Sequence, residues 1–141
     1  MRAVRALLKN TNAPWSLHPQ ESVFDALNTL AGHDVGALMV MEEGRLVGIL
    51  SERDYTRKIA LLGKSSKDTR VADIMTAKVL TVDANARTED CMALMSQKKI
   101  RHLPVLDGDK VLGMISIRDI MDEIIADQEA TISQLQSYIA S

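Results

Sequence analysis

The chain has 141 residues, is 46% hydrophobic but only 3% aromatic, and carries a formal net charge of −2 at pH 7. The low charge argues against a general nucleic-acid binder, which is normally strongly basic. The single cysteine, Cys91, excludes an intrachain disulfide and fits a reducing compartment. No apolar run approaches the roughly 20 residues of a membrane span, and the N-terminus is not typical of a signal peptide. We therefore expect a cytoplasmic protein with an aliphatic, methionine-rich core and no membrane partner.

Two helices are predicted in the first half of the chain. Apolar residues recur at three- and four-residue spacing over 23–30, the pattern of a one-faced helix. Proline suits a first turn and glycine suits a C-terminal cap, so His18-Pro19 marks the start of this helix and Gly32 its cap. We expect the helix over 23–33, and its copy in the second half over 88–98. A second helix is expected over about 52–62, ending at Gly63.

A hairpin is predicted between these helices. Two short apolar runs, 37–41 and 46–50, predict strands, and the residues 42–45 between them predict the turn. The stretch 64–70 is polar and rich in turn formers, and we interpret it as a linker. The order of the first half is thus helix, hairpin, helix and linker.

Every element of the first half returns in the second half, 65 residues later and without a gap. The stretch Gly-Ile-Leu-Ser-Glu-Arg-Asp at 48–54 returns as Gly-Met-Ile-Ser-Ile-Arg-Asp at 113–119. Further identities at this offset include Asp25 and Asp90, Leu38 and Leu103, Val40 and Val105, and Ile59 and Ile124. An ungapped register across helices and hairpins indicates an internal duplication.

The duplication defines the predicted domains. We predict a first repeat over 1–63, a linker over 64–70, a second repeat over 71–126 and a C-terminal helix extension over 127–141. A repeat of about 60 residues buries too little surface to be comfortably stable alone. We therefore expect an α+β fold in which the two repeats pack through their sheets with pseudo-two-fold symmetry. Antiparallel hairpins need one covered face, and the two helices of each repeat supply it.

The final helix continues past the second repeat with an apolar stripe that has no counterpart in the first half. Its members recur at spacings of four or three: Ile117, Met121, Ile124, Gln128, Ile132, Leu135 and Ile139. A stripe that outlasts its domain usually packs on something outside it. We interpret it as a homodimer contact; the alternative is a helix that folds back over its own domain or frays.

The duplicated pattern Ser-x-x-Asp, at Ser51 and Asp54 and again at Ser116 and Asp119, has two interpretations. Serine followed by an acid three residues later is close to a helix capping box, which is a purely structural device. A helix N-terminus also offers free N–H groups and the positive end of a dipole, which suit phosphate. The symmetric duplication favours a ligand site, and capping and ligand binding can coexist.

The charged residues around the motif specify the kind of ligand. Arg53 and Arg118 precede the two aspartates and can make charge-assisted contacts to phosphate. A carboxylate repels phosphate but can accept from both hydroxyls of a ribose. Phosphate donors together with a diol acceptor describe a nucleotide better than a bare phosphate.

The two motifs differ in the strand that precedes them. The second repeat has Arg101-His102 where the first has Gly36-Ala37, so the arginine and histidine are not needed by the fold. They are either asymmetric ligand contacts or ordinary surface charges. Three dispersed histidines and one cysteine do not form a metal-binding pattern, so no metal is expected.

Taken together, these motifs resemble a CBS domain pair, also called a Bateman module. The resemblance rests on the duplicated Gly-apolar-apolar-Ser-x-x-Asp, on Leu103-Pro104-Val105, and on Val-Ala-Asp-Ile-Met-Thr at 71–76. It implies β-α-β-β-α repeats, adenosyl-ligand sites in the cleft between repeats, and disc-shaped dimers. It also implies that Asp54 and Asp119 bind ribose and that Ser51 and Ser116 reach phosphate.

The resemblance further places the segments 35–39 and 100–104 near adenine and phosphates, and 76–79 along the second site. The full set of predicted ligand contacts is Gly36, Ala37, Ser51, Arg53, Asp54, Thr76, Val79, Ile100, Arg101, His102, Pro104, Ser116, Arg118 and Asp119. The first repeat departs from the pattern, with Leu38-Met39-Val40 in place of Leu-Pro-Val. We therefore expect the site at Asp119 to be the better phosphate site, and the small Gly36-Ala37 pair to admit a larger ligand such as NAD.

The expected function is that of a stand-alone regulatory module. AMP is the favoured ligand, with ADP, ATP, NAD and S-adenosylmethionine as the other candidates, and the regulated partner protein is not identified by the sequence. One alternative is a structural dimerisation module with vestigial sites. A nucleotide-hydrolysing enzyme is disfavoured, because no nucleophile–base pair is evident in the sequence.

Overall fold

The computed structural model describes residues 2–8 and 15–140, and it confirms an α+β fold made of two tandem repeats. Residues 15–80 form one compact unit, here called the first-repeat unit. Residues 2–8 together with 81–140 form the other, called the second-repeat unit. Each unit contains one three-stranded sheet.

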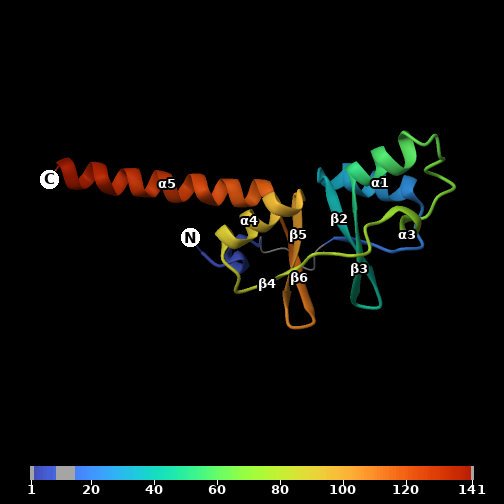
Figure 1. The fold of residues 1–141 in the computed structure, drawn as a ribbon, viewed down its shortest axis with the longest axis horizontal. Coiled ribbons are helices and arrows are strands. Elements are labelled where there is room, and N and C mark those ends of the chain that lie inside the picture. The colour runs from blue at the N-terminus through green and yellow to red at the C-terminus, as the bar shows by residue number, and fades with distance from the viewer. Residues whose placement is uncertain (1, 9–14, 141) are drawn as a thin grey trace. The chain divides into compact units, whose positions relative to one another are not determined.

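The first-repeat unit follows the predicted order (Figure 1). Its elements are β1 (Ser16–Leu17), α1 (Val23–His33), β2 (Ala37–Glu42), β3 (Arg45–Ser51), α2 (Glu52–Tyr55), the π-helical η2 (Thr56–Ala60) and α3 (Val71–Ile74). The sheet has the order β1-β2-β3, with β1 parallel to β2 and β2 antiparallel to β3. The expected second helix is thus an α-helical turn that continues as a π-helix, and the chain turns at Gly63, which has a φ of +66°.

The second-repeat unit has the same topology. Its elements are η1 (Val4–Leu7), β4 (Val82–Asp83), α4 (Thr88–Lys98), β5 (His102–Asp107), β6 (Lys110–Ser116) and α5 (Ile117–Ala140). The sheet has the order β4-β5-β6, again with one parallel and one antiparallel pairing. The β-α-β-β-α repeat is therefore confirmed in both halves.

Helix α1 spans the predicted residues, but other residues cap it. Pro19 lies in a turn before the helix, and the helix begins at Val23, where the Ser22 side chain accepts the Asp25 N–H at 3.1 Å. Gly32 lies inside the helix, whose C-terminal cap is Asp34 in the left-handed conformation, with a φ of 53°. The predicted span of the helix, 23–33, is therefore confirmed. Its capping residues differ, because a serine cap and an aspartate, which tolerates this conformation, replace proline and glycine.

The polar stretch 64–70 does more than connect the repeats. The carbonyls of Ser66 and Thr69 accept the N–H groups of Phe24 and Val23, at 2.9 and 2.8 Å. These N–H groups belong to the first turn of α1 and have no partner within the helix. The linker therefore closes the start of α1.

Each unit has its own aliphatic core. In the first-repeat unit it contains Leu17, Val23, Ala26, Leu30, Leu38, Val40, Leu50, Ile59, Val71 and Ile74. In the second-repeat unit it contains Val4, Ala84, Cys91, Met95, Leu103, Val105, Ile115 and Ile120. Several members occupy the same place in both repeats, as Leu38 and Leu103 do, so the duplication extends to the packing.

The segment that leads into each repeat packs in the other unit. Val71 donates its N–H to the Glu21 carbonyl at 2.8 Å, and Val4 donates to the Ala86 carbonyl, also at 2.8 Å. The two acceptors are 65 residues apart, so η1 occupies in its unit the place that α3 occupies in the other. The predicted first repeat, 1–63, therefore differs from the compact unit, because residues 2–8 pack with the second repeat.

The predicted helix extension is the last part of α5, which runs as one helix to Ala140. Every residue over 128–140 is exposed. Within the described residues, none of the helices combines the length and hydrophobicity needed to cross a membrane. The packing of the two sheets against each other stays a prediction.

Candidate functional site

The junction between β3 and α2 is a capping box. Ser51 donates its N–H to Asp54 Oδ2 at 3.0 Å, and the Asp54 N–H returns to Ser51 Oγ at 3.1 Å. The Ser51 hydroxyl also donates to Asp54 Oδ2 at 3.0 Å. The structural interpretation of Ser-x-x-Asp is thus confirmed, and the cap fixes the carboxylate at the mouth of the helix.

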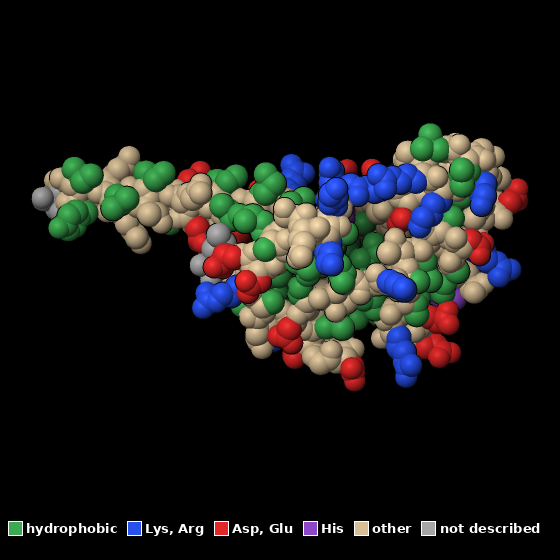
Figure 2. Space-filling view, viewed as in Figure 1, with side chains coloured by type: hydrophobic (Ala, Val, Ile, Leu, Met, Phe, Trp, Pro, Cys, Tyr) green, Lys and Arg blue, Asp and Glu red, His purple; other side chains and the backbone are tan. Residues whose placement is uncertain are grey.

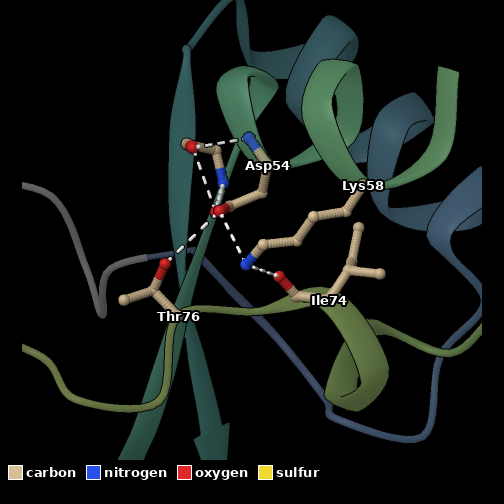
Figure 3. A network of polar contacts seen from close by, with 5 residues as sticks. Asp54, Lys58, Ile74 and Thr76 are labelled. Atoms are coloured by element: carbon tan, nitrogen blue, oxygen red, sulfur yellow. Dashed lines mark hydrogen bonds and ion pairs between the residues drawn. The ribbon is translucent and has the colours of Figure 1, made fainter. Parts of the chain in front are cut away.

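The second oxygen of Asp54 is also occupied (Figure 3). Thr76 donates its hydroxyl to Asp54 Oδ1 at 3.3 Å, and the Lys58 ammonium lies 3.2 Å from the same oxygen. Lys58 is itself held by the Ile74 carbonyl, at 2.7 Å from its Nζ. A carboxylate has about four lone-pair positions, so these two contacts and those from Ser51 nearly saturate Asp54.

The junction between β6 and α5 repeats the cap but not the rest of the network. Ser116 donates its N–H to Asp119 Oδ2 at 2.8 Å, and the Asp119 N–H returns to Ser116 Oγ at 3.2 Å. Within residues 2–8 and 15–140, no residue other than Ser116 makes a hydrogen bond or ion pair to the Asp119 carboxylate. Asp119 therefore keeps acceptor capacity that Asp54 has used.

The difference arises one helical turn after each aspartate. Glu123 stands where the first repeat has Lys58, and it faces Arg2 instead of Asp119. Arg2 donates to both Glu123 oxygens, with its Nε 2.7 Å from Oε1. Glu123 is only 6% exposed, and the Arg2 hydrogen bonds hold its pKa below the ordinary value despite burial. The N-terminal segment thus pairs the buried acid and leaves Asp119 without an ammonium group.

The strands beside the two caps bring the other predicted contacts close. Gly36 and Arg101 accept the first N–H of the following helices, from Glu52 at 3.0 Å and from Ile117 at 2.8 Å. His102 is the direct ladder partner of Ser116, as Ala37 is of Ser51. Strand pairing therefore places Arg101 and His102 beside the second cap.

Burial sets the protonation state of His102. It lowers the pKa of the His102 imidazole, and this effect outweighs the opposite influence of the Asp119 carboxylate. The Arg101 guanidinium lowers the pKa further. At neutral pH the imidazole is consequently uncharged, so it can donate a hydrogen bond to phosphate but brings no positive charge to the second cap.

The motif glycines, Gly48 and Gly113, lie where another segment of the chain packs closely against the strand. A Cβ on Gly48 would lie 2.6 Å from the Met75 sulfur and 3.1 Å from the Thr76 carbonyl oxygen, whereas one on Gly113 would meet the Leu8 side chain at 3.0 Å. Thr76 also exchanges two backbone hydrogen bonds with Ile49. The space beside these glycines is therefore filled by the segments that lead into the repeats.

The remaining predicted residues lie at varied distances from the caps. Arg53 and Arg118 are exposed on the first turns of their helices. Pro104 is buried in β5, the central strand of its sheet, and Val79 lies in the segment that leads to β4. Thr76 contacts Asp54 of the first motif, and its predicted place along the second site stays a prediction.

Two residues that set the charge around the motif aspartates were not identified from the sequence. Lys58 and Glu123 are visible as a charge reversal at the 65-residue offset, but their partners are 16 and 121 residues away. No pattern in the sequence links Arg2 to Glu123. The described part of the chain holds no group of three or more His, Cys, Asp or Glu side chains that could bind a metal ion.

The chain is similar to known proteins along most of its length. The family model of the CBS domain matches it twice, at 4–61 and 71–126. The mitochondrial CBS domain-containing protein CBSX3 of Arabidopsis thaliana is 40% identical over 124 residues, which cover 84% of this chain and 60% of that protein. The chain thus spans less than two thirds of this relative.

Solved structures of CBS domain proteins also match most of the chain. The crystal structure of the CBS domain protein NE2398 is 46% identical, with a TM-score of 0.83, and the match covers 88% of this chain and 98% of that one. The CBS domain pair of MJ0100, in complex with 5-methylthioadenosine and S-adenosyl-L-methionine, is 26% identical with a TM-score of 0.78. That match covers 89% of this chain and 97% of the other. The chain belongs to the CBS domain family and carries the domain twice.

Proposed function

We propose that this CBS domain pair is a regulatory module that binds an adenosyl ligand, with AMP favoured over ADP, ATP, NAD and S-adenosylmethionine. The proposal depends on one observation above all. Asp119 is fixed by Ser116 at the end of a strand, yet one of its oxygens receives no contact from another described residue. A pre-positioned carboxylate with spare lone pairs suits the two hydroxyls of a ribose.

The ligand class follows from chemistry shared by a relative. The MJ0100 domain pair binds 5-methylthioadenosine and S-adenosyl-L-methionine, which have an adenosine ribose in common. Every candidate ligand carries the same diol. Arg118 and Arg101 are exposed near the second cap and can reach a phosphate, which favours a nucleotide over an uncharged nucleoside.

The two motifs have different proposed roles. The site at Asp119, with Ser116, Arg118 and His102, is the principal nucleotide site. The site at Asp54 is the weaker one, because Lys58 and Thr76 compete with a ribose for the same oxygen. Its neighbours Gly36 and Ala37 have small side chains, which leaves room for a larger ligand such as NAD.

Binding would regulate a partner protein without catalysis. A ligand shifts a conformational equilibrium only by the difference in its affinity for the two states, so the module requires two states and a partner that distinguishes them. A second candidate function is a structural interaction module. It is favoured by the near-saturated Asp54 carboxylate, which is expected of a cap that has lost its ligand.

The experiment is a thermal-stability scan of the protein against AMP, ADP, ATP, NAD and S-adenosylmethionine. A ligand of the native state at one hundred times its Kd adds about 2.7 kcal/mol to the free energy of unfolding. We expect AMP to give the largest shift. If none of the five ligands changes the thermal midpoint at millimolar concentration, the ligand-binding regulatory function is refuted and the structural module is favoured. Turnover of a stabilising ligand would show an enzyme instead.

A further inference from the structure

Helix α5 presents two apolar faces in its first turns. Ile117, Ile120 and Ile124 pack in the core of the second-repeat unit. Met121 and Ile125, on a neighbouring face, are 52% and 50% exposed. The stripe expected from the sequence therefore separates into an inner face that holds the helix on its domain and an outer face that remains uncovered.

The outer face continues to the end of the helix as a heptad pattern. Its members, here called the α5 seam, are Met121, Ile125, Gln128, Ile132, Leu135 and Ile139. Their spacing is four, three, four, three and four, and at 3.6 residues per turn they lie within an arc of about 80°. Ile132, Leu135 and Ile139 are 53%, 57% and 81% exposed. Figure 2 shows apolar side chains along this helix beyond the rest of its unit.

Most of the seam lies outside the CBS domain. The family model ends at residue 126, and four of the six seam residues lie after it. The exposed stretch 128–140 is short for a helix without tertiary support, since isolated helices below roughly 12–15 residues are marginal in water. A helix here needs a cover for its apolar face.

We infer that the cover is the α5 seam of a second copy of this chain, in a parallel, two-stranded coiled coil. Isoleucine occupies the three a positions, Ile125, Ile132 and Ile139. Methionine, glutamine and leucine occupy the d positions. Isoleucine at a with leucine at d favours two parallel strands. A strict 3.5-residue repeat packs best on a helix with the same repeat, and a second copy provides one by identity.

Gln128 fixes the direction of the pair. In a parallel pair in register, the two Gln128 side chains face each other and can hydrogen-bond through their amides. In an antiparallel pair centred on the seam, Gln128 would face Ile132, and its amide would be buried without a partner, which is unfavourable. A single polar residue in the seam therefore selects the parallel, in-register pairing.

The charge pattern favours a second copy over a membrane surface. Helices that lie on membranes carry lysine and arginine on their polar face, whereas α5 has no basic residue after Arg118. Residues 130–140 carry no charge at all. In the parallel pair, the flanking contacts would include Thr131 with Gln136, so no like charges oppose self-association.

The first test measures the mass of the full chain in solution by light scattering and sedimentation. Ile132→Glu with Leu135→Glu places charges in the seam, whereas Ser133→Glu with Gln134→Glu adds the same charges outside it. We expect a dimer for the wild type and for the control, and a dimer Kd raised by on the order of 100-fold or more for the seam variant. A monomeric wild type at its highest soluble concentration, or equal Kd values for the two variants, would overturn the inference.

Two further measurements check the folding of the variants and the direction of the helix pair. Both seam substitutions are at exposed positions, so we expect the thermal midpoint of the repeats to stay unchanged while helical circular dichroism decreases. Direction is tested by oxidising Ile139→Cys in a Cys91→Ala background, since the first repeat has Ala26 at the position of Cys91. A parallel pair gives a 139–139 disulfide dimer, and Ser133→Cys gives none. Cross-linking of Ile139→Cys only to Met121→Cys would overturn the parallel arrangement.

Discussion

The two Ser-x-x-Asp motifs share a backbone cap but differ in what surrounds the carboxylate. Asp54 accepts from Ser51, Thr76 and Lys58, whereas the described contacts of the Asp119 carboxylate come from Ser116 alone. The difference shows that duplication conserves the cap while side chains elsewhere decide how much of the carboxylate is available to a ligand.

The decisive position is the fourth residue after each aspartate. Lys58 neutralises Asp54 within the first-repeat unit. Glu123 would repel Asp119, but it is turned away by a bidentate contact to Arg2 from the N-terminal segment. The residue at this place in the helix therefore neutralises the first carboxylate and leaves the second without an ammonium partner.

The largest expected effect is on ligand binding when each aspartate is removed. A charged acceptor contributes roughly 1.5–3 kcal/mol per hydrogen bond, so Asp119→Ala, which removes two bonds to a ribose, should weaken AMP binding by on the order of 100-fold. Asp54→Ala should weaken it less. Calorimetric titration measures both, and Asp119→Asn, which keeps an acceptor for Ser116, controls for loss of the cap. Equal losses, or a larger loss at Asp54, would contradict the ranking of the two sites.

The motif glycines offer a second comparison, in stability. A methyl group on Gly48 would meet the Thr76 backbone oxygen as well as the Met75 sulfur, and overpacking of this kind costs about 1–3 kcal/mol. A methyl group on Gly113 would meet only the end of the Leu8 side chain, which can move. Urea unfolding of Gly48→Ala and Gly113→Ala should therefore show the larger loss for Gly48→Ala. Equal losses would mean that Thr76 moves as easily as Leu8.

The third comparison concerns Lys58. Lys58→Met keeps the length of the side chain but frees Asp54 Oδ1 from its ammonium partner. We expect ligand affinity at the first site to rise by on the order of tenfold, with the titration showing two sites more clearly than in the wild type. Arg57→Met removes the same charge from the preceding residue, which is exposed, and should change the ligand affinity little. A fall in affinity for Lys58→Met would show that Lys58 contacts the ligand itself.

Local patterns predict most of this fold. Periodicity and the 65-residue offset identify both hairpins and the core of each helix, because those elements are stabilised by neighbours close in sequence. The offset also pairs the two caps correctly. The caps of α1 are the exception, since Ser22 and Asp34 cap the helix in place of Pro19 and Gly32.

The parts that the sequence does not predict depend on distant contacts. The segment 2–8 packs with the second repeat, although it directly precedes the first. Val4 and Val71 have the same role at an offset of 67, a similarity too weak to stand out without the structure. The Arg2–Glu123 pair follows from this packing, so the sequence did not show that Asp119 lacks an ammonium partner.

The smallest expected effect is on the pH dependence of stability, and it concerns His102 of the second site. His102 takes the place of Ala37, and burial lowers its pKa. The unfolded chain therefore takes up a proton near the ordinary histidine value of about 6.5 before the folded chain does, and stability falls as the pH drops through that value. His102→Ala, which copies the first repeat, should lose less stability over the same range in thermal unfolding. A bound phosphate group favours the protonated imidazole, so AMP should offset part of the loss in the wild type only. Identical pH profiles for the two proteins would show that His102 does not titrate with folding.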